Sequence, residues 1–318
     1  MTAATLDTRL HAIRLEAEGV LSFELRAAEG RLPPFTAGAH VDVHLPNGLA
    51  RSYSLCNPQE EDHRYVIGVS RDPASRGGSS HMHDHLKVGQ TLRVSAPRNH
   101  FALDEAAPHS VLVAGGIGIT PLWAMVQRLV ALDRPWELHY AARSRRSAAF
   151  VDALRQLPAS LRQRVHLRFD DEQDGLLDLA AIRSHAPQGA HFYCCGPAPM
   201  MAAFQAALAG LPSGRIHLEH FKAAAPVRTD GGFEVELARS GRVLAVGAGR
   251  SILDVVLDAG VDVPHSCMEG ICGSCEVGLL AGDPDHRDMV LSESQRQANR
   301  SMLLCCSGAL SSRLVLDL

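Results

Sequence analysis

Hydrophobic and polar residues alternate in short runs along the first third of the chain. The apolar members of these runs are Leu21, Phe23 and Leu25, then Val41, Val43 and Leu45, then 65–69, and then Leu92 and Val94. A period of two, punctuated by Gly and Pro, is typical of antiparallel strands with one buried face. We therefore expect residues 1–103 to form a small antiparallel β-barrel domain.

The pattern changes after a polar stretch at 104–109. Continuous apolar runs at 110–114, 137–141, 165–169 and 190–195 alternate with helical patterns at 122–132, 148–157 and 200–211. Buried parallel strands covered by helices produce this alternation. Residues 104–224 are therefore predicted to form an α/β parallel-sheet domain of the kind that binds nucleotides.

A third domain is predicted over residues 231–318, after a breaker-rich linker at 222–232. Two alternating runs, 233–237 and 243–246, flank a Ser-Gly turn and predict a hairpin. Apolar residues from Ile252 to Ala259 follow helical spacing, with Ser251 and Asp254 as a capping box and Gly260 as the terminator. The chain is thus expected to be multidomain.

Composition narrows the class of protein. The 318 residues are 46% hydrophobic with a formal net charge of −4, which argues against disorder and against a nucleic-acid-binding surface. No apolar run approaches the length of a membrane span, and the N-terminus lacks the apolar core of a secretory signal. We expect a soluble, cytoplasmic protein without nucleic-acid or membrane partners.

Five of the eight cysteines lie between Cys267 and Cys306. Four follow the C-x4-C-x2-C…C spacing of plant-type [2Fe-2S] ligands, namely Cys267, Cys272, Cys275 and Cys305. Gly270, Gly273 and Gly278 would let the loop wrap so that backbone N–H groups point at sulfur. Structural zinc is the alternative, but zinc sites usually pair two short Cys-x2-Cys motifs. Cys306 is expected to pack as a small apolar side chain.

Two segments of the first domain have the chemistry to hold a flavin phosphate. In 51–54 (RSYS), a guanidinium suits a phosphate, a tyrosine suits an aromatic ring or a sugar hydroxyl, and a serine suits a flavin nitrogen. In 76–80 (RGGSS), glycines and hydroxyls precede a predicted helix, whose N-terminus favours anions. Taken alone, 51–54 favours an ordinary exposed strand over a flavin site.

Two segments of the second domain favour a dinucleotide. Residues 115–121 (GGIGITP) lie between a predicted strand and helix, where glycines allow close approach to a pyrophosphate; Pro121 suits the first helical position and suits a plain strand–helix turn equally. The segment is not GxGxxG, so the usual fingerprint does not apply directly. Cys195 ends a predicted strand where α/β sheets bind ligands, with a buried structural thiol as the alternative.

Together and in this order, these segments resemble the ferredoxin–NADP reductase superfamily, and most of all reductases of the phthalate dioxygenase reductase and vanillate O-demethylase reductase type. The resemblance spans essentially the whole chain. Its motifs are 51–58, 76–80, 115–121, 195–200, 219–221, the cysteine loop and 285–291. It implies an FMN-binding barrel, an NAD-binding domain and a C-terminal β-grasp ferredoxin domain.

The resemblance also implies residue roles. For FMN they fall on Arg51 at the phosphate, Tyr53 and Ser54 at the isoalloxazine and ribityl groups, and Gly77, Gly78, Ser79 and Ser80 in the phosphate cradle. For the dinucleotide they fall on Gly116, Gly118 and Thr120 at the pyrophosphate, and on Cys195, Gly196 and Pro197 beside the nicotinamide. Phe221 would cover the flavin, and Ser54, Cys195 and Phe221 would form the catalytic set.

Electron counting links the three sites. Nicotinamide gives two electrons as a hydride and a [2Fe-2S] cluster accepts one, so a flavin must stand between them. The resemblance favours NADH, although Arg143, Arg145 and Arg146 leave NADPH open. It implies a separate Rieske-type oxygenase, acting on an aromatic compound, as the electron acceptor. The alternatives are a stand-alone flavin reductase with a structural metal and a non-enzymatic metal-dependent scaffold.

Overall fold

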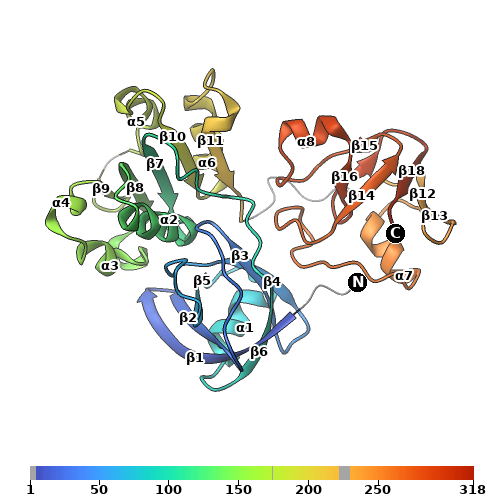
Figure 1. The fold of residues 1–318 in the computed structure, drawn as a ribbon, viewed down its shortest axis with the longest axis horizontal. Helices are drawn as coiled ribbons and strands as arrows, with labels where there is room; N and C mark the ends of the chain where they lie inside the picture. Colours follow the sequence, from blue (N-terminus) through green and yellow to red (C-terminus); the bar gives the residue numbers. More distant parts are fainter. Residues whose placement is uncertain (1–4, 174, 222–229) are drawn as a thin grey trace. The chain divides into compact units, whose positions relative to one another are not determined.

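The computed structural model describes residues 5–173, 175–221 and 230–318 (Figure 1). Contacts group Thr5–Phe221 into one compact unit, and 230–318 belong to a second. The predicted boundary at 103 falls between two sheets of the first unit. The predicted boundary at 224 and most of the predicted linker at 222–232 fall outside the described residues. The three domain ranges therefore stay predictions.

The first sheet of unit Thr5–Phe221 is antiparallel, as predicted, and has the order β4-β3-β6-β1-β2-β5. Its strands are β1 (Thr5–Ala17), β2 (Val20–Ala27), β3 (His40–His44), β4 (Ala50–Ser54), β5 (Arg64–Ser70) and β6 (Thr91–Ser95), with helix α1 (Gly78–His85) between β5 and β6. The alternating residues fill its core, which includes Phe23, Leu25, Val41 and Val43. The strands curve around this core in blue and cyan (Figure 1).

The second sheet is parallel, as predicted, with the order β11-β10-β7-β8-β9. Its strands are β7 (Ser110–Gly115), β8 (Trp136–Ala142), β9 (Val165–Phe169), β10 (His191–Cys195) and β11 (Ile216–Glu219). The pattern did not predict β11, which is short and only half-buried. The order reverses direction at β7, where open α/β sheets bind ligands beyond the strand ends.

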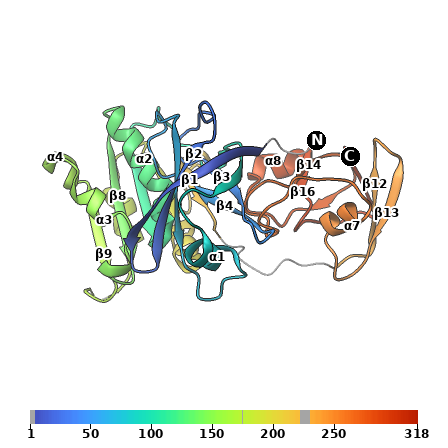
Figure 2. The same cartoon turned by 90° about the horizontal axis from the view of Figure 1, so that it is seen from below.

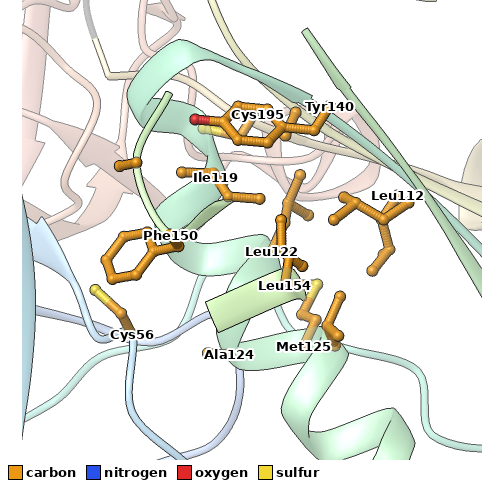
Figure 3. Close-up of a cluster of buried hydrophobic side chains, with 14 of the residues drawn as sticks. Cys56, Leu112, Ile119, Leu122, Ala124, Met125, Tyr140, Phe150, Leu154 and Cys195 are labelled. Atoms are coloured by element: carbon orange, nitrogen blue, oxygen red, sulfur yellow. The ribbon is translucent and has the colours of Figure 1, made fainter. Parts of the chain in front are cut away.

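Helices cover both faces of this sheet. Helices α2 (Ile119–Ala131) and α3 (Val151–Arg155) lie beside β7 and β8 on one face (Figure 2), while α5 (Leu179–His185) and α6 (Ala198–Ala207) pack on β7 and β10 on the other. A single turn, α4 (Ala159–Arg162), precedes β9. Figure 3 shows the core under α2, where Cys56 of the antiparallel-sheet region lies next to Phe150. Because the two sheets share this core, Thr5–Phe221 behaves as one unit.

Three predicted helix positions were inexact. Helix α2 begins at Ile119, not Leu122, so Pro121 is its third residue and not its first. Proline is tolerated there because the first N–H groups of a helix have no partner inside it. The helices predicted at 148–157 and 200–211 are shorter, at Val151–Arg155 and Ala198–Ala207. Phe150 has a left-handed backbone, with φ of 60°, and cannot belong to α3.

The second unit has a mixed sheet of order β13-β12-β18-β14-β16, in which β12 and β18 are parallel. Its elements are β12 (Phe233–Leu237), β13 (Arg242–Val246), α7 (Ile252–Asp258), β14 (Glu276–Ala281), β15 (Pro284–Asp285), α8 (Glu293–Ala298), β16 (Ser301–Leu303), β17 (Gly308–Ala309) and β18 (Arg313–Leu316). The predicted hairpin is β12–β13, and Ser251 and Asp254 form the predicted capping box of α7. Helix α7 packs on the sheet, as in a β-grasp fold.

Within the described ranges, no helix combines the length and the apolar character needed to span a bilayer.

Candidate functional site

The carboxyl ends of β7 and β10 meet through glycine backbone. A Cβ at Gly118 would lie 2.1 Å from the carbonyl oxygen of Cys195, and one at Gly115 would lie 3.1 Å from Cα of Gly196. Protein packing therefore requires glycine at both positions. Gly116 differs, because it has a φ of 55° and open space where its Cβ would be. Of these glycines, Gly116 is the one that leaves room for a ligand.

Thr120 and Pro197 frame this edge of the sheet. The buried Thr120 hydroxyl donates to the carbonyl of Ile117 at 3.0 Å, and its methyl lies against Gly68 of β5. Pro197 caps the N-terminus of α6 and contacts Gly115. Thr120 therefore holds the 116–120 turn in place, and through Gly68 it ties that turn to the first sheet.

Arg51 of β4 lies against the N-terminus of α1. A Cβ at Gly78 would come within 2.9 Å of the Arg51 Cγ and 3.0 Å of its Nε, so glycine leaves space for the guanidinium. Gly77 caps the helix with a φ of 90°, and Asn47 donates to its carbonyl at 3.0 Å. A cation beside the N-terminus of a helix suits the phosphate of a flavin mononucleotide.

Serines complete this cradle. Ser79 and Ser80 both lie within 3.2 Å of the Ser75 hydroxyl, and Ser79 accepts the N–H of Asp72 at 3.1 Å. These bonds fold the 72–80 loop back onto the first turn of α1. The hydroxyls therefore stand where an anion at the helix N-terminus would need donors.

Tyr53 precedes the end of β4 and is half-buried against the barrel core. Burial raises the pKa of its phenol to about 12, although the neighbouring Arg51 charge opposes the shift. The ring is therefore a neutral, partly desolvated surface over the working pH range. Such a surface suits contact with a flavin ring or a sugar hydroxyl.

Ser54 ends β4 and connects the two sheets. Its buried hydroxyl donates to Glu219 Oε2 of β11 at 3.3 Å. Glu219 is in register with Cys195 of the neighbouring strand β10. Burial raises the pKa of Glu219 to about 8, and burial with the adjacent Glu219 raises the pKa of Cys195 well above its usual range. Phe221 follows β11 and packs against the same core.

Glu219 was absent from the predicted catalytic set, although it lies in the 219–221 motif. The sequence offers one signal, an acidic residue two positions before the aromatic Phe221. Its importance depends on β11, which the hydrophobic pattern did not reveal. The structure thus brings Ser54, Cys195 and Phe221 to one region and adds a protonated carboxyl group at pH 7.

In the second unit, all four predicted cluster ligands are buried. Hydrogen bonds from the thiols of Cys272 and Cys305, and then from backbone N–H groups including that of Glu269, hold the pKa of Cys267 far below its usual range. A hydrogen bond from the Cys305 thiol likewise lowers the pKa of Cys275. Thiols this close, with N–H donors aimed at sulfur, fit a [2Fe-2S] cluster held by four thiolates.

The loop around these thiols depends on two of the three glycines that the sequence suggested. Gly270 and Gly273 have φ of 73° and 71°, and a Cβ at Gly270 would lie 2.5 Å from Cys306 Sγ. The suggestion for Gly278 was wrong, because that residue lies within β14 and pairs with Ser301. Cys306 is buried in the apolar core, as predicted.

Comparisons with known proteins agree with this arrangement. A model described as an oxidoreductase NAD-binding domain matches residues 112–206, and one described as a 2Fe-2S iron-sulfur cluster binding domain matches 235–310. The chain is 57% identical to phenoxybenzoate dioxygenase subunit beta of Ectopseudomonas oleovorans, over 100% of this chain and 98% of that protein. It is 45% identical to a vanillate O-demethylase oxidoreductase of a Pseudomonas strain, over 98% and 100%.

A solved structure of phthalate dioxygenase reductase, described as a modular structure for electron transfer from pyridine nucleotides to [2Fe-2S], superposes with a TM-score of 0.74. It is 40% identical and covers 99% of this chain and 98% of its own. The predicted NAD, FMN and [2Fe-2S] cofactors are confirmed at the level of the fold and its domains. The chain belongs to the family of phthalate dioxygenase reductases and vanillate O-demethylase reductases, which carry electrons from a pyridine nucleotide through a flavin to a [2Fe-2S] cluster and on to an oxygenase.

Proposed function

We propose that this reductase serves a Rieske-type terminal oxygenase that hydroxylates or demethylates an aromatic compound. The observation that carries the proposal is that one chain holds both a buried contact between strand ends, at Ser54, Glu219 and Cys195, that suits a hydride-accepting flavin, and a set of four buried thiols suited to single electrons. The names of the relatives, a phenoxybenzoate dioxygenase subunit and a vanillate O-demethylase oxidoreductase, support the aromatic assignment. A cytoplasmic location is part of the proposal, because cluster thiolates require reducing conditions.

We further propose the residue roles at the hydride site. Arg51, Gly77, Gly78, Ser79 and Ser80 hold the FMN phosphate, and Tyr53 contacts the flavin ring. Ser54 places its hydroxyl at the flavin edge, and Glu219 holds that hydroxyl in position while its carboxyl group is neutral. The neutral Cys195 thiol stands beside the nicotinamide, and Phe221 covers the flavin until nicotinamide replaces it. When bound, the flavin accepts a hydride and releases electrons singly.

For the dinucleotide, we propose Gly116, Gly118, Thr120, Gly196 and Pro197 as the turns that surround the pyrophosphate. Within this set, Gly116 leaves space, while Gly118 and Thr120 fix the backbone.

NADH is the proposed donor, with NADPH as the weaker alternative. Arg145, which follows β8, is already paired with both carboxylate oxygens of Glu172, at 3.0 and 2.8 Å, and lies over the Phe169 ring. A 2′-phosphate near this pair would meet the Glu172 carboxylate as well as the guanidinium. The pair therefore offers a 2′-phosphate little net attraction.

One experiment tests the assignment as a whole. Purified holoenzyme is titrated anaerobically with NADH, and in parallel with NADPH, while flavin and iron–sulfur absorbance are followed; the released flavin is then identified. We expect FMN, bleaching of both chromophores by NADH, and rapid reduction of a purified Rieske oxygenase but not of a haem monooxygenase. Zinc in place of iron and acid-labile sulfide would refute the cluster, and preferential reduction of the haem protein would refute the Rieske partner.

A further inference from the structure

We propose that Glu137, His139 and His166 form a binding site for Zn²⁺ on the parallel sheet, separate from the flavin, nucleotide and cysteine sites. One carboxylate oxygen and one nitrogen from each imidazole all lie within 4.8 Å of one another. Two imidazoles and a carboxylate are a common ligand set for zinc, with water in the fourth position.

The fold explains why these side chains share a surface. Glu137 and His139 are two apart on β8 and therefore point to the same face. His139 is in register with His166 on the neighbouring parallel strand β9. On that face, helices α5 and α6 pack their apolar side chains over β7 and β10. They leave β8 and β9 uncovered, and these two strands carry polar residues there. The site therefore lies on two adjacent strands near one edge of the sheet.

The distances require only side-chain adjustment. His139 Nε2 lies 3.5 Å from Glu137 Oε1, and the two imidazole rings are stacked with centroids 4.7 Å apart and planes 19° apart. Tetrahedral zinc with Zn–N bonds of about 2.0–2.1 Å needs donor atoms about 3.3 Å apart. Rotation about the side-chain torsions closes the remaining gap, because the backbone register already places the Cα atoms opposite one another.

The polar atoms also suit a cation. His139 Nε2 is buried without a hydrogen-bond partner. A bound cation would give this nitrogen a partner, at a point where two imidazole rings are otherwise only stacked.

A direct test counts zinc on the intact holoenzyme. Protein is dialysed against a chelator, its iron and sulfide content is confirmed, and ZnCl₂ binding is measured by calorimetry and by metal analysis after gel filtration. We expect one Zn²⁺ per chain in the wild type. Losing even an outer-shell partner costs about 10–100-fold in metal affinity, so His166→Gln is expected to weaken binding at least about tenfold. His139→Gln should do the same.

Matched controls locate the site. His11→Gln removes another exposed histidine, and a double variant, His81→Gln with His85→Gln, removes the neighbouring pair on α1, whose rings are 5.0 Å apart. Both controls should bind zinc like the wild type. His166 is exposed, so its variant should keep its visible spectrum and its unfolding midpoint. Equal zinc binding by His166→Gln and wild type, or loss of zinc from the α1 double variant alone, would overturn the proposal.

Discussion

The two compact units build their redox sites in different ways. In 230–318, three of the four thiols come from a single loop, and that loop's own backbone supplies the N–H donors and left-handed glycines that shape it. In Thr5–Phe221, the hydride site takes Ser54 from the end of β4, Cys195 from β10 and Glu219 from β11. One site is local in sequence, and the other exists only when two sheets share a core.

This difference determines how each site should fail. A change in the loop removes the cluster and leaves the other unit's core untouched. A change at a contact between strand ends in Thr5–Phe221 alters the hydride site through packing, because Gly118 packs against the Cys195 carbonyl and Thr120 holds the adjoining turn through Ile117. The two units therefore permit a pair of complementary experiments. One variant should lose electron transfer through the cluster and keep flavin reduction by NADH, and the other should lose flavin reduction and keep the cluster.

Cys272→Ser is expected to have the largest effect. Loss of one thiolate should remove the cluster, so iron content and NADH-driven cytochrome reduction fall to background, while NADH still bleaches the bound flavin. Cys306→Ala is the matched control. Cys306 is buried beside the same loop, and we expect a stability loss of about 1 kcal/mol with the cluster intact. Cytochrome reduction that survives Cys272→Ser would show that electrons leave without the cluster.

Gly118→Ala should instead impair the reaction with NADH and leave the cluster in place. The added methyl would lie 2.1 Å from the Cys195 carbonyl oxygen, so the turns after β7 and β10 must separate. We expect about 3 kcal/mol of destabilisation and loss of flavin reduction by NADH, with iron and sulfide retained. Unfolding is measurable by tryptophan fluorescence, because Trp123 and Trp136 both lie in this unit.

Gly116→Ala serves as the comparison for that variant. It faces open space, so it should cost only the left-handed backbone strain of about 1–2 kcal/mol. Equal losses in the two variants would mean that the contact between the turns is not what matters.

The same contrast explains what the sequence revealed. The cysteine spacing, the hairpin and the capped helix are local patterns. The hairpin and the capped helix were predicted at the right residues, and the four predicted cysteines are all buried. Four of the five parallel strands were also predicted, because buried strands are continuous apolar runs. Glu219 escaped notice because its strand is short and half-buried. The His139 and His166 pairing escaped for a related reason, since only strand register brings residues of β8 and β9 together.

Ser54→Ala is expected to have a smaller effect than either disruption. The variant removes a hydroxyl from the proposed flavin edge without disturbing the neighbouring backbone. Loss of one positioned donor at a reacting centre costs about 100-fold in rate. Stopped-flow measurement of flavin reduction by NADH should show this loss, with flavin, iron and sulfide content unchanged. Wild-type rates in the variant would remove Ser54 from the hydride site.

The smallest effect is expected from titration of Glu219. Its pKa is raised to about 8 by burial, so the carboxyl group is protonated at pH 7 and ionises just above it. An ionised carboxylate accepts the Ser54 hydroxyl more strongly than a neutral acid does, and it holds that hydroxyl away from the flavin edge. The rate of flavin reduction should therefore fall several-fold as pH rises through about 8. The pH–rate profile of Glu219→Gln should show no such fall.

Stability provides an independent check with a defined sign. The folded pKa of Glu219 lies above the ordinary value of 4.5, so between 4.5 and about 8 the folded state holds a proton that the unfolded state has released. The contribution of this proton is therefore fully present below pH 4.5 and is lost as pH rises through about 8. Relative to Glu219→Gln, the wild-type unfolding free energy, measured by tryptophan fluorescence, should decline between about pH 4.5 and pH 8 and level off above that. Parallel pH profiles would mean that Glu219 is already ionised and that Ser54 is held by a carboxylate throughout.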